Sequence, residues 1–324
     1  MTKDAQHQIR HRIFIGGTGR CGTGELLWWL GQHPDIHAIP AETRFIVDPD
    51  GLAKLSRILT IEYTPDTSYT GLKRFDELMR FVLGYADDGD FKETKLYSVF
   101  GREHFLETLR QLMVFMTHFE YTYDSGSDLV DGYCFPSTNQ KRRVVIPRYF
   151  EDPTALTAAM ARFVDRLFSK PALESGKIGW CEKTPFNILE APFLWTLFPD
   201  ATLIHITRDP RGVLESMQRQ RWAPDDPNHV MVVLNNIYAR WAHVKEAMSP
   251  PSPEQYIEVK LEDLAADPQL LNRIVRQMGL PEYDSPVACD PHRIYAWQRP
   301  KFHETANLCT RSLAPYFPLM GYEI

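Results

Sequence analysis

Near its amino terminus the chain reads Ile13-Phe14-Ile15-Gly16-Gly17-Thr18-Gly19-Arg20-Cys21-Gly22-Thr23-Gly24. The β-branched and aromatic residues predict a strand, the glycines a tight turn, and the apolar run that follows, residues 25–30, a helix. A turn of this kind gathers backbone N–H groups at the N-terminus of the helix, where they attract anions. The segment therefore predicts an anion-binding loop between a strand and a helix.

The loop has the glycine spacing of nucleotide-triphosphate loops but differs from them at two positions. Gly17 and Gly22 have the Gly-x-x-x-x-Gly separation, whereas Thr23 replaces the lysine and Gly24 replaces the Mg²⁺-binding hydroxyl residue. Arg20 adds a guanidinium fork, which suits a pair of phosphate or sulfate oxygens. These features favour a phosphate donor other than a metal–triphosphate complex. The alternative is a glycine-rich turn that binds no ligand.

The composition is that of a globular chain of enzyme size. Its 324 residues are 44% hydrophobic and 24% charged, which suits one α/β domain with an insertion. The formal net charge of −6 argues against broad nucleic-acid binding, so an anion site has to be local. Five scattered cysteines indicate neither a disulfide framework nor a metal cluster and favour the cytoplasm. We expect no signal segment and no transmembrane segment.

Strand-like and helix-like runs alternate along the chain, which predicts an α/β fold with a parallel sheet. We expect strands at 12–16, 201–207 and 255–261, helices after the first two, and a third helix from Glu262 towards Met278. The segment from about residue 58 to 171 differs and is interpreted as a mostly helical insertion. Its apolar residues follow helical spacing and then give way to an aromatic stretch: Phe105, Leu109, Leu112, Met113, Met116 and Phe119, then Tyr121, Tyr123, Tyr133 and Phe135.

A second cluster begins with the apolar run from Leu203 to Thr207 and continues into a capped helix. Asp209 can accept hydrogen bonds from the first free N–H groups of that helix, and Pro210 suits its first position. Arg208 then lies at the carboxyl end of the strand and Ser216 in the second helical turn, at the edge where α/β sheets bind ligands. The alternative is that Arg208 pairs with a surface carboxylate and Ser216 is solvated.

Together these two clusters resemble the nucleotide-binding motifs of sulfotransferases that use 3′-phosphoadenosine 5′-phosphosulfate (PAPS). The resemblance implies a three-layer P-loop-like fold, with a central parallel sheet flanked by helices. It implies one sulfotransferase domain over residues 1–324, with the insertion at roughly 58–171 on the acceptor side. It also implies PAPS as co-substrate, bound by Gly17, Thr18, Gly19, Arg20, Cys21, Gly22, Thr23, Gly24, Arg208 and Ser216.

The pattern is most similar to that of the protein-tyrosine sulfotransferases and their bacterial relatives. The chain has His33-Pro34-Asp35 and then Glu42-Thr43-Arg44, although one extra residue separates the histidine from the glutamate. The likeness implies that Glu42 is the catalytic base and that Arg44 helps to hold the acceptor. It also implies that Lys183 lies beside the donor, where it would share stabilisation of the leaving group with Arg20. The alternatives are a surface pair between Glu42 and Arg44 and a solvated Lys183.

The acceptor is not defined by these motifs. We expect a hydroxyl group on a carbohydrate, a lipid-linked compound, or a small alcohol or phenol, with peptide tyrosine as the alternative. Lys141-Arg142-Arg143 and Arg148 could receive an acidic peptide, but a basic run is more often a solvated face. We expect no metal, because the histidines show no paired motif. A P-loop kinase and a non-catalytic nucleotide-binding protein are the alternatives of another class, and the oligomeric state stays open.

Overall fold

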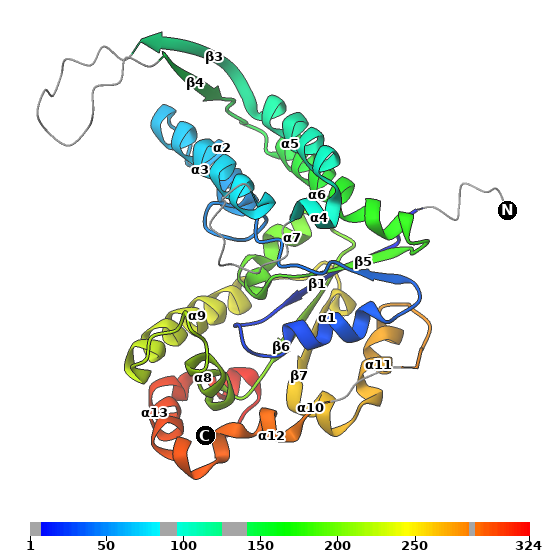
Figure 1. Cartoon of the computed structure of the whole chain (residues 1–324), viewed down its shortest axis with the longest axis vertical. Coiled ribbons are helices and arrows are strands. Elements are labelled where there is room, and N and C mark those ends of the chain that lie inside the picture. Colours follow the sequence, from blue (N-terminus) through cyan, green and yellow to red (C-terminus); the bar gives the residue numbers. More distant parts are fainter. Residues whose placement is uncertain (1–7, 85–95, 125–140, 285–288) are drawn as a thin grey trace, which may run out of the picture.

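The computed structural model describes residues 8–84, 96–124, 141–284 and 289–324. At its centre is a parallel sheet of five strands in the order β2-β5-β1-β6-β7 (Figure 1). The strands are β1 (His11–Gly16), β2 (Ile36–Ala38), β5 (Gly179–Lys183), β6 (Thr202–Thr207) and β7 (Tyr256–Lys260). Helices flank this sheet, so the expected α/β fold with a central parallel sheet is confirmed.

The central strands are apolar because helices cover the sheet. In β1 the last four residues are buried, and the ring of Phe14 meets that of Trp180 in β5 edge to face, with centroids 5.2 Å apart. Trp180 in turn packs against Phe168 of α6 (Thr154–Glu174), with centroids 5.0 Å apart. Helix α1 (Thr23–Gly31) contacts β1, β2 and β5 and buries Trp29. Such strands carry nearly continuous apolar runs instead of strict alternation.

The other helices of the sheet layers follow the strands in chain order. Helices α7 (Ala191–Leu197) and α8 (Pro210–Gln218) lie before and after β6, and α9 (Pro227–Ala247) packs against α8. After β7 come α10 (Leu261–Ala266), α11 (Gln269–Gln277), α12 (Pro291–Ile294) and α13 (His303–Leu313). The short 3₁₀ helices are η2 (Pro185–Glu190), η3 (Pro253–Gln255), η4 (Ala296–Gln298), η5 (Pro300–Phe302), η6 (Ala314–Tyr316) and η7 (Pro318–Met320).

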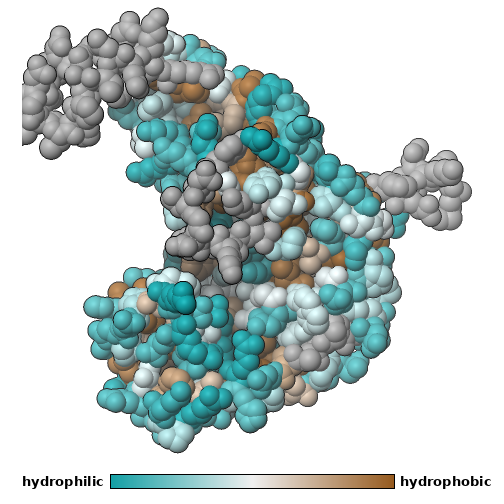
Figure 2. Space-filling model, in the orientation of Figure 1, coloured by the Kyte–Doolittle hydropathy of each residue, from teal (hydrophilic) through white to brown (hydrophobic). Residues whose placement is uncertain are grey.

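Between β2 and β5 the chain leaves the sheet and forms the upper part of Figure 1. This part contains α2 (Leu52–Leu59), α3 (Pro65–Leu83), α4 (Leu96–Phe100), α5 (Arg102–Met116) and α6, together with the antiparallel pair β3 (Thr117–Asp124) and β4 (Lys141–Pro147). It is mostly helical, as expected. In the space-filling view, hydrophilic side chains cover most of the visible face and hydrophobic ones form separate small groups (Figure 2).

The aromatic end of the insertion differs from the prediction. The prediction that the helical segment includes Phe119 is wrong. Helix α5 ends at Met116, and Phe119 lies in β3 with 51% of its surface exposed. The residues from Thr117 to Tyr123 alternate aromatic with β-branched or polar side chains, which is the period of a strand. Tyr133 and Phe135 lie outside the described residues. The domain boundaries proposed for the whole chain stay a prediction.

The sequence predicts neither β2 nor β5, and one predicted helix is broken. Strand β2 has only three residues, and β5 carries Glu182 and Lys183, so neither shows the apolar run that marks β1. The helix expected from Glu262 towards Met278 is two helices, α10 and α11, because Pro268 lacks the N–H that a continuous helix needs. Asp267 Oδ1 accepts a hydrogen bond from Gln269 N at 3.0 Å, at the start of α11.

The strand order fixes where the loops of the sheet meet. All five strands are parallel, so their carboxyl ends lie at one edge of the sheet. The glycine loop follows the central strand β1. The segments after β5 and β2 lie on one side of it, and the segment after β6 lies on the other. The order therefore brings Glu42 and Lys183 to one side of the loop and Arg208 to the opposite side.

The end of β1 is held tightly between its neighbours. A β-carbon on Gly16 would lie 2.6 Å from the backbone N of Ile188, and one on Gly17 would lie 2.7 Å from the carbonyl O of Ile206 in β6. Gly17 N also donates a hydrogen bond to Pro185 O at 2.7 Å. A β-carbon on Gly24, by contrast, would meet nothing within 4 Å. Glycine is therefore required by packing at the start of the loop but not at its end.

Among the described residues, no helix combines the length and apolar composition needed to cross a membrane. The described cysteines, Cys21, Cys181, Cys289 and Cys309, are free thiols.

Replacing Gly17 by alanine is expected to lower the free energy of unfolding by about 1–3 kcal/mol, because the new methyl group would press on the backbone of β6. The matched variant Gly24→Ala is expected to keep the stability or raise it by about 0.5–1 kcal/mol, since alanine favours the helix. Urea unfolding followed by circular dichroism measures both. Equal losses in the two variants would contradict the close packing described for Gly17.

Candidate active site

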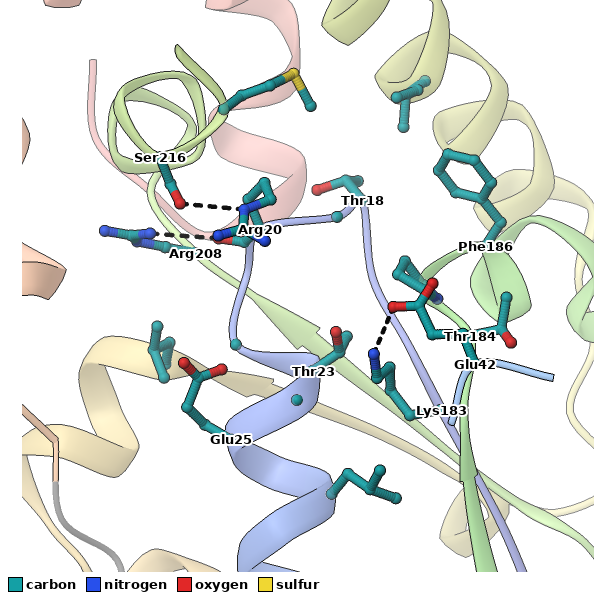
Figure 3. A pocket seen from close by; sticks show the side chains of 18 of the residues that line it. Thr18, Arg20, Thr23, Glu25, Glu42, Lys183, Thr184, Phe186, Arg208 and Ser216 are labelled. Carbon is teal, nitrogen blue, oxygen red and sulfur yellow. Dashed lines mark hydrogen bonds and ion pairs between the residues drawn. The ribbon is translucent and has the colours of Figure 1, made fainter. Parts of the chain in front are cut away.

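A cavity of about 1060 Å³ opens at the carboxyl edge of the sheet, and the glycine loop forms part of its lining. Figure 3 shows two groups of side chains on opposite sides of this loop. One group is Arg20, Arg208 and Ser216, and we call its side the arginine half. The other group is Glu42, Lys183 and Phe186, and we call its side the Glu42 half. All six residues line the cavity. The structure therefore brings Arg20 of the glycine loop next to Arg208 and Ser216, although more than 150 residues separate them in the sequence.

The glycine loop has a left-handed backbone at three of its residues. The φ angles are 86° at Gly19, 56° at Arg20 and 99° at Gly22, which is the N-cap of α1. Glycine adopts this region without steric cost, whereas Arg20 is a non-glycine residue held there by its surroundings. A turn of this shape before a helix presents backbone N–H groups to an anion. The loop is therefore built as the sequence predicts.

Three side chains of the loop are buried. Thr18 lies within 3.4 Å of the hydroxyl of Tyr238 in α9, which anchors the loop to that helix. Cys21 is fully buried, and burial raises the pKa of its thiol to about 11, so it stays neutral. Thr23 lines the cavity although only 5% of its surface is exposed. Gly24 lines the cavity beside open space. Thr18 and Cys21 thus support the shape of the loop.

Arg208 follows β6 and lies almost fully buried along α8, where Gly212 leaves room for it. A β-carbon on Gly212 would lie 2.8 Å from Arg208 Nε. The guanidinium donates hydrogen bonds to backbone carbonyls, from Nη2 to Arg293 O and Ile294 O at 2.8 Å and from Nη1 to Arg20 O at 3.3 Å. As the sequence predicts, Asp209 caps α8 by accepting from Arg211 N at 2.8 Å.

Arg208 is a buried cation that no carboxylate of the described residues contacts directly. Its Nε is buried and has no hydrogen-bond partner there. Burial lowers the pKa of Arg208, because loss of water disfavours the charged guanidinium. A buried charge satisfied only by neutral carbonyls is costly, and an anionic ligand would offset that cost. The alternative that Arg208 pairs with a surface carboxylate is therefore wrong.

Ser216 lies beside Arg20 at the same side of the cavity. Arg20 Nε donates to Ser216 Oγ at 3.2 Å, and only 5% of the surface of Ser216 is exposed. The expectation that Ser216 could be a solvated serine is therefore wrong. Arg208, Arg20 and Ser216 form one cluster with donors from both predicted motifs.

In the Glu42 half, Lys183 Nζ donates to Glu42 Oε1 at 2.5 Å. The side chain of Lys183 is 15% exposed and that of Glu42 is 43% exposed. The pair joins the end of β5 to the segment after β2. These two segments lie side by side because β2 and β5 are neighbours in the sheet. The surface pair between Glu42 and Arg44, left open by the sequence, does not form, because Arg44 Nε donates to Asp48 Oδ2 at 2.7 Å. Arg44 has a positive φ of 60° and lines the cavity.

A buried carboxylate, Glu182, holds this half together and was not predicted from the sequence. Its Oε1 accepts hydrogen bonds from Thr43 Oγ1 at 2.9 Å, Thr43 N at 3.3 Å and Thr184 Oγ1 at 2.7 Å, and its Oε2 accepts from Asn187 Nδ2 at 2.8 Å. Asn187 Nδ2 also donates to Ile15 O of β1 at 3.0 Å. Thr43 follows Glu42 and Thr184 follows Lys183, so Glu182 positions both members of the pair.

Burial raises the pKa of Glu182, and the four donated hydrogen bonds oppose that shift. Thr184 is the N-cap residue of the 3₁₀ helix η2, but its hydroxyl makes no cap hydrogen bond and donates to Glu182 instead. The signal that could have identified Glu182 is an acidic residue inside a strand, where a charge has to be satisfied by neighbours.

Several other cavity residues come from segments that the motifs do not include. Arg219, Trp222 and Arg293 line the arginine half, and Trp222 is 65% exposed. Arg219 pairs with the buried Glu215 at 2.9 Å. An exposed ring at this place offers a flat surface on which an aromatic ligand can stack. Arg148, by contrast, is not part of the cavity lining and packs on Phe115 instead.

Within the described ranges, no three His, Cys, Asp or Glu side chains converge to form a metal site. The expectation that the protein uses no metal stays a prediction.

Comparison with known proteins shows a resemblance to sulfotransferases over part of the chain. A model of the sulfotransferase family matches residues 128–285, which is 158 of the 324 residues. The match includes Lys183, Arg208 and Ser216 but neither the glycine loop nor Glu42. The match bears out the resemblance to sulfotransferases that the motifs indicate. A search of curated proteins found no significant match.

Solved structures similar to this chain are bacterial sulfotransferases. The sulfotransferase domain from the curacin biosynthetic pathway is 13% identical, with a TM-score of 0.44 and coverage of 98% of this chain and 99% of that domain. The sulfotransferase from Alicyclobacillus acidocaldarius is 15% identical, with a TM-score of 0.43 and 97% of each chain covered. A sulfotransferase from Mycobacterium tuberculosis is 15% identical, with a TM-score of 0.40 and coverage of 97% and 79%.

Replacing Glu182 by glutamine is expected to lower the free energy of unfolding by about 2–3 kcal/mol, because the amide cannot accept all four hydrogen bonds and leaves buried donors unpaired. Glu42→Gln is the matched control, since Glu42 is largely exposed and its loss should change stability by less than about 1 kcal/mol. Urea denaturation compares the two variants. A small effect of Glu182→Gln, equal to that of the control, would contradict the positioning role.

Proposed function

We propose that this protein moves the sulfuryl group of PAPS to a hydroxyl acceptor. The observation that carries the proposal is the buried guanidinium of Arg208, which lines the cavity, donates to three backbone carbonyls and contacts no carboxylate of the described residues. One of these carbonyls belongs to Arg20, whose side chain donates to Ser216. Such a cation fits a phosphate group.

The cluster and the loop give the nucleotide two anion sites. Arg208 and Ser216 would bind the 3′-phosphate, and the backbone from Gly17 to Gly24 would bind the 5′-phosphosulfate. Both sites line one cavity, so a single nucleotide can reach them together. Gly24 has no side chain, so only its backbone would contact the 5′-phosphosulfate.

Glu42, Lys183 and Arg20 are the proposed catalytic residues. The acceptor oxygen forms a bond to sulfur while the bond from sulfur to the bridging oxygen of the 5′-phosphate breaks, and the acceptor proton passes to Glu42. The products are a sulfate ester and adenosine 3′,5′-bisphosphate. Lys183 and Arg20 would stabilise charge that grows on the leaving phosphate, and Arg44 would contact the acceptor.

Other functions fit the cavity less well. A P-loop kinase needs the lysine and metal-binding hydroxyl that Thr23 and Gly24 replace. A non-catalytic nucleotide-binding protein has no use for a pair such as Glu42 and Lys183. Transfer to peptide tyrosine is the alternative acceptor reaction. We propose the cytoplasm as the compartment, on the scattered free cysteines alone.

Adenosine 3′,5′-bisphosphate is expected to bind at least about tenfold more tightly than adenosine 5′-monophosphate, since only the former has the 3′-phosphate that Arg208 would contact. Arg208→Gln should remove this difference while affinity for the monophosphate is retained. Isothermal titration calorimetry measures both nucleotides, and circular dichroism confirms that the variant is folded. Tighter binding of ATP–Mg²⁺ than of the bisphosphate by the unmodified protein would overturn the sulfotransferase proposal.

Replacing Glu42 by glutamine is expected to lower kcat by about 10²–10⁴-fold, because the acceptor proton then has no base. The affinity for adenosine 3′,5′-bisphosphate should be unchanged, since Glu42 lies in the other half of the cavity. Transfer of labelled sulfate from PAPS to a panel of hydroxyl compounds measures the first value, and calorimetry measures the second. Unchanged turnover with intact nucleotide binding would show that Glu42 is not the base.

A further inference from the structure

The walls of the Glu42 half define the chemistry of the compound that binds there. Beside the Glu42–Lys183 pair the cavity is lined by proline and apolar side chains, and the lining includes Pro40, Ala41, Pro49, Phe186, Val233 and Ile237. Phe186 belongs to η2, which packs against α9, and in Figure 3 the ribbon of α9 runs beside the Phe186 ring. The cavity therefore has an apolar wall next to the two proposed catalytic groups.

Helix α9 has apolar side chains beyond those that its core face needs. Val230, Leu234 and Tyr238 are buried against the protein interior. Val233 is 41% exposed and Ile237 is partly exposed, and these two residues are one helical turn apart and both line the cavity. Apolar side chains left open to a cavity favour an apolar ligand, because covering them removes apolar surface from water.

The charges of this half are already compensated. Lys183 pairs with Glu42 at 2.5 Å and Arg44 pairs with Asp48 at 2.7 Å. The arginine half differs, because Arg20, Arg208 and Arg293 line it against two carboxylates (Glu25 and Asp290), in addition to Arg219, which pairs with Glu215. An anionic acceptor, such as an acidic peptide, would find no excess positive charge beside Glu42.

Some polar groups of this half are also engaged. The Thr184 hydroxyl donates to Glu182, and Arg44 Nε donates to Asp48. A sugar exposes many hydroxyl groups and loses affinity where a buried hydroxyl finds no partner. The Glu42 half thus offers the Glu42–Lys183 pair for one reacting hydroxyl, with Arg44 nearby, and an apolar wall for the remainder of the acceptor.

We propose that the acceptor is an uncharged aromatic hydroxyl compound, whose ring lies against Phe186, Val233 and Ile237 while its hydroxyl faces Glu42. The inference rests on the proposed sulfuryl transfer and specifies its acceptor. The product is then an aryl sulfate ester, formed as the phenolic oxygen bonds to sulfur and its proton passes to Glu42. The volume of about 1060 Å³ lies at the upper end of ligand cavities, which suits a nucleotide together with a small ring compound.

The test uses the full chain with PAPS and three acceptors: 2-naphthol, a tyrosine peptide flanked by acidic residues, and lactose. 2-Naphthol is expected to give the highest kcat/KM, and calorimetry should detect its binding to the complex with adenosine 3′,5′-bisphosphate. Val233→Asp should raise the KM for 2-naphthol by about tenfold or more, because a carboxylate replaces part of the apolar wall. Val232→Asp is the matched control, since Val232 is the preceding residue of α9, is 60% exposed and is not among the cavity-lining residues. It should change that KM less than about twofold.

The outcomes separate this inference from the proposed function. If adenosine 3′,5′-bisphosphate binds but the acidic peptide or lactose is sulfated with the higher kcat/KM, the aromatic acceptor is wrong and sulfuryl transfer stands. Equal KM changes in Val233→Asp and Val232→Asp, with nucleotide affinity retained in both, would also overturn the assignment of the wall. If neither the nucleotide binds nor any acceptor is sulfated, the proposed function fails and this inference fails with it.

Discussion

The close approach of the β1 terminus to its two neighbours is the constraint on which the site depends. Gly16 lies against the backbone of η2 and Gly17 against the carbonyl of Ile206, so any side chain at these points would push the strands apart. The hydrogen bond from Gly17 N to Pro185 O fixes the same junction. Because β5 and β6 lie on opposite sides of β1, the loop that leaves this junction has the segment after β5 on one side and the segment after β6 on the other. The two halves of the cavity are a direct consequence of that order.

Each half contains a buried charge that the fold satisfies without an opposite charge in contact. Arg208 donates to three backbone carbonyls, and Glu182 accepts from two threonines and an asparagine. The two groups nevertheless differ in what they leave open. Glu182 has both oxygens occupied and serves to position Thr43 and Thr184, whereas Arg208 retains a buried Nε without a partner. Glu182 therefore organises the site, whereas Arg208 is the buried charge that lines the cavity in which a ligand would lie.

The sequence predicts the parts of this arrangement that are local. The glycine loop, the cap at Asp209 and the position of Arg208 follow from residues next to one another in the chain, and the structure contains all three. Contacts between distant segments could not be predicted in this way. Nothing near Arg208 in the sequence indicates that the carbonyls of Arg293 and Ile294 hold it, and nothing near Glu42 indicates Lys183 as its partner. Strand β5 escaped prediction because Glu182 and Lys183 interrupt its apolar run, although these residues carry much of the site. Phe119 follows helical spacing by chance, since the neighbouring residues alternate as a strand does.

A structure of the protein with adenosine 3′,5′-bisphosphate bound would test the account of the divided cavity most directly. We expect the 3′-phosphate to lie within hydrogen-bond distance of the Arg208 guanidinium and Ser216 Oγ, and the 5′-phosphate to lie over the backbone from Gly17 to Gly24. A nucleotide bound in the reverse direction, or outside the cavity without contact to Arg208, would contradict the divided cavity.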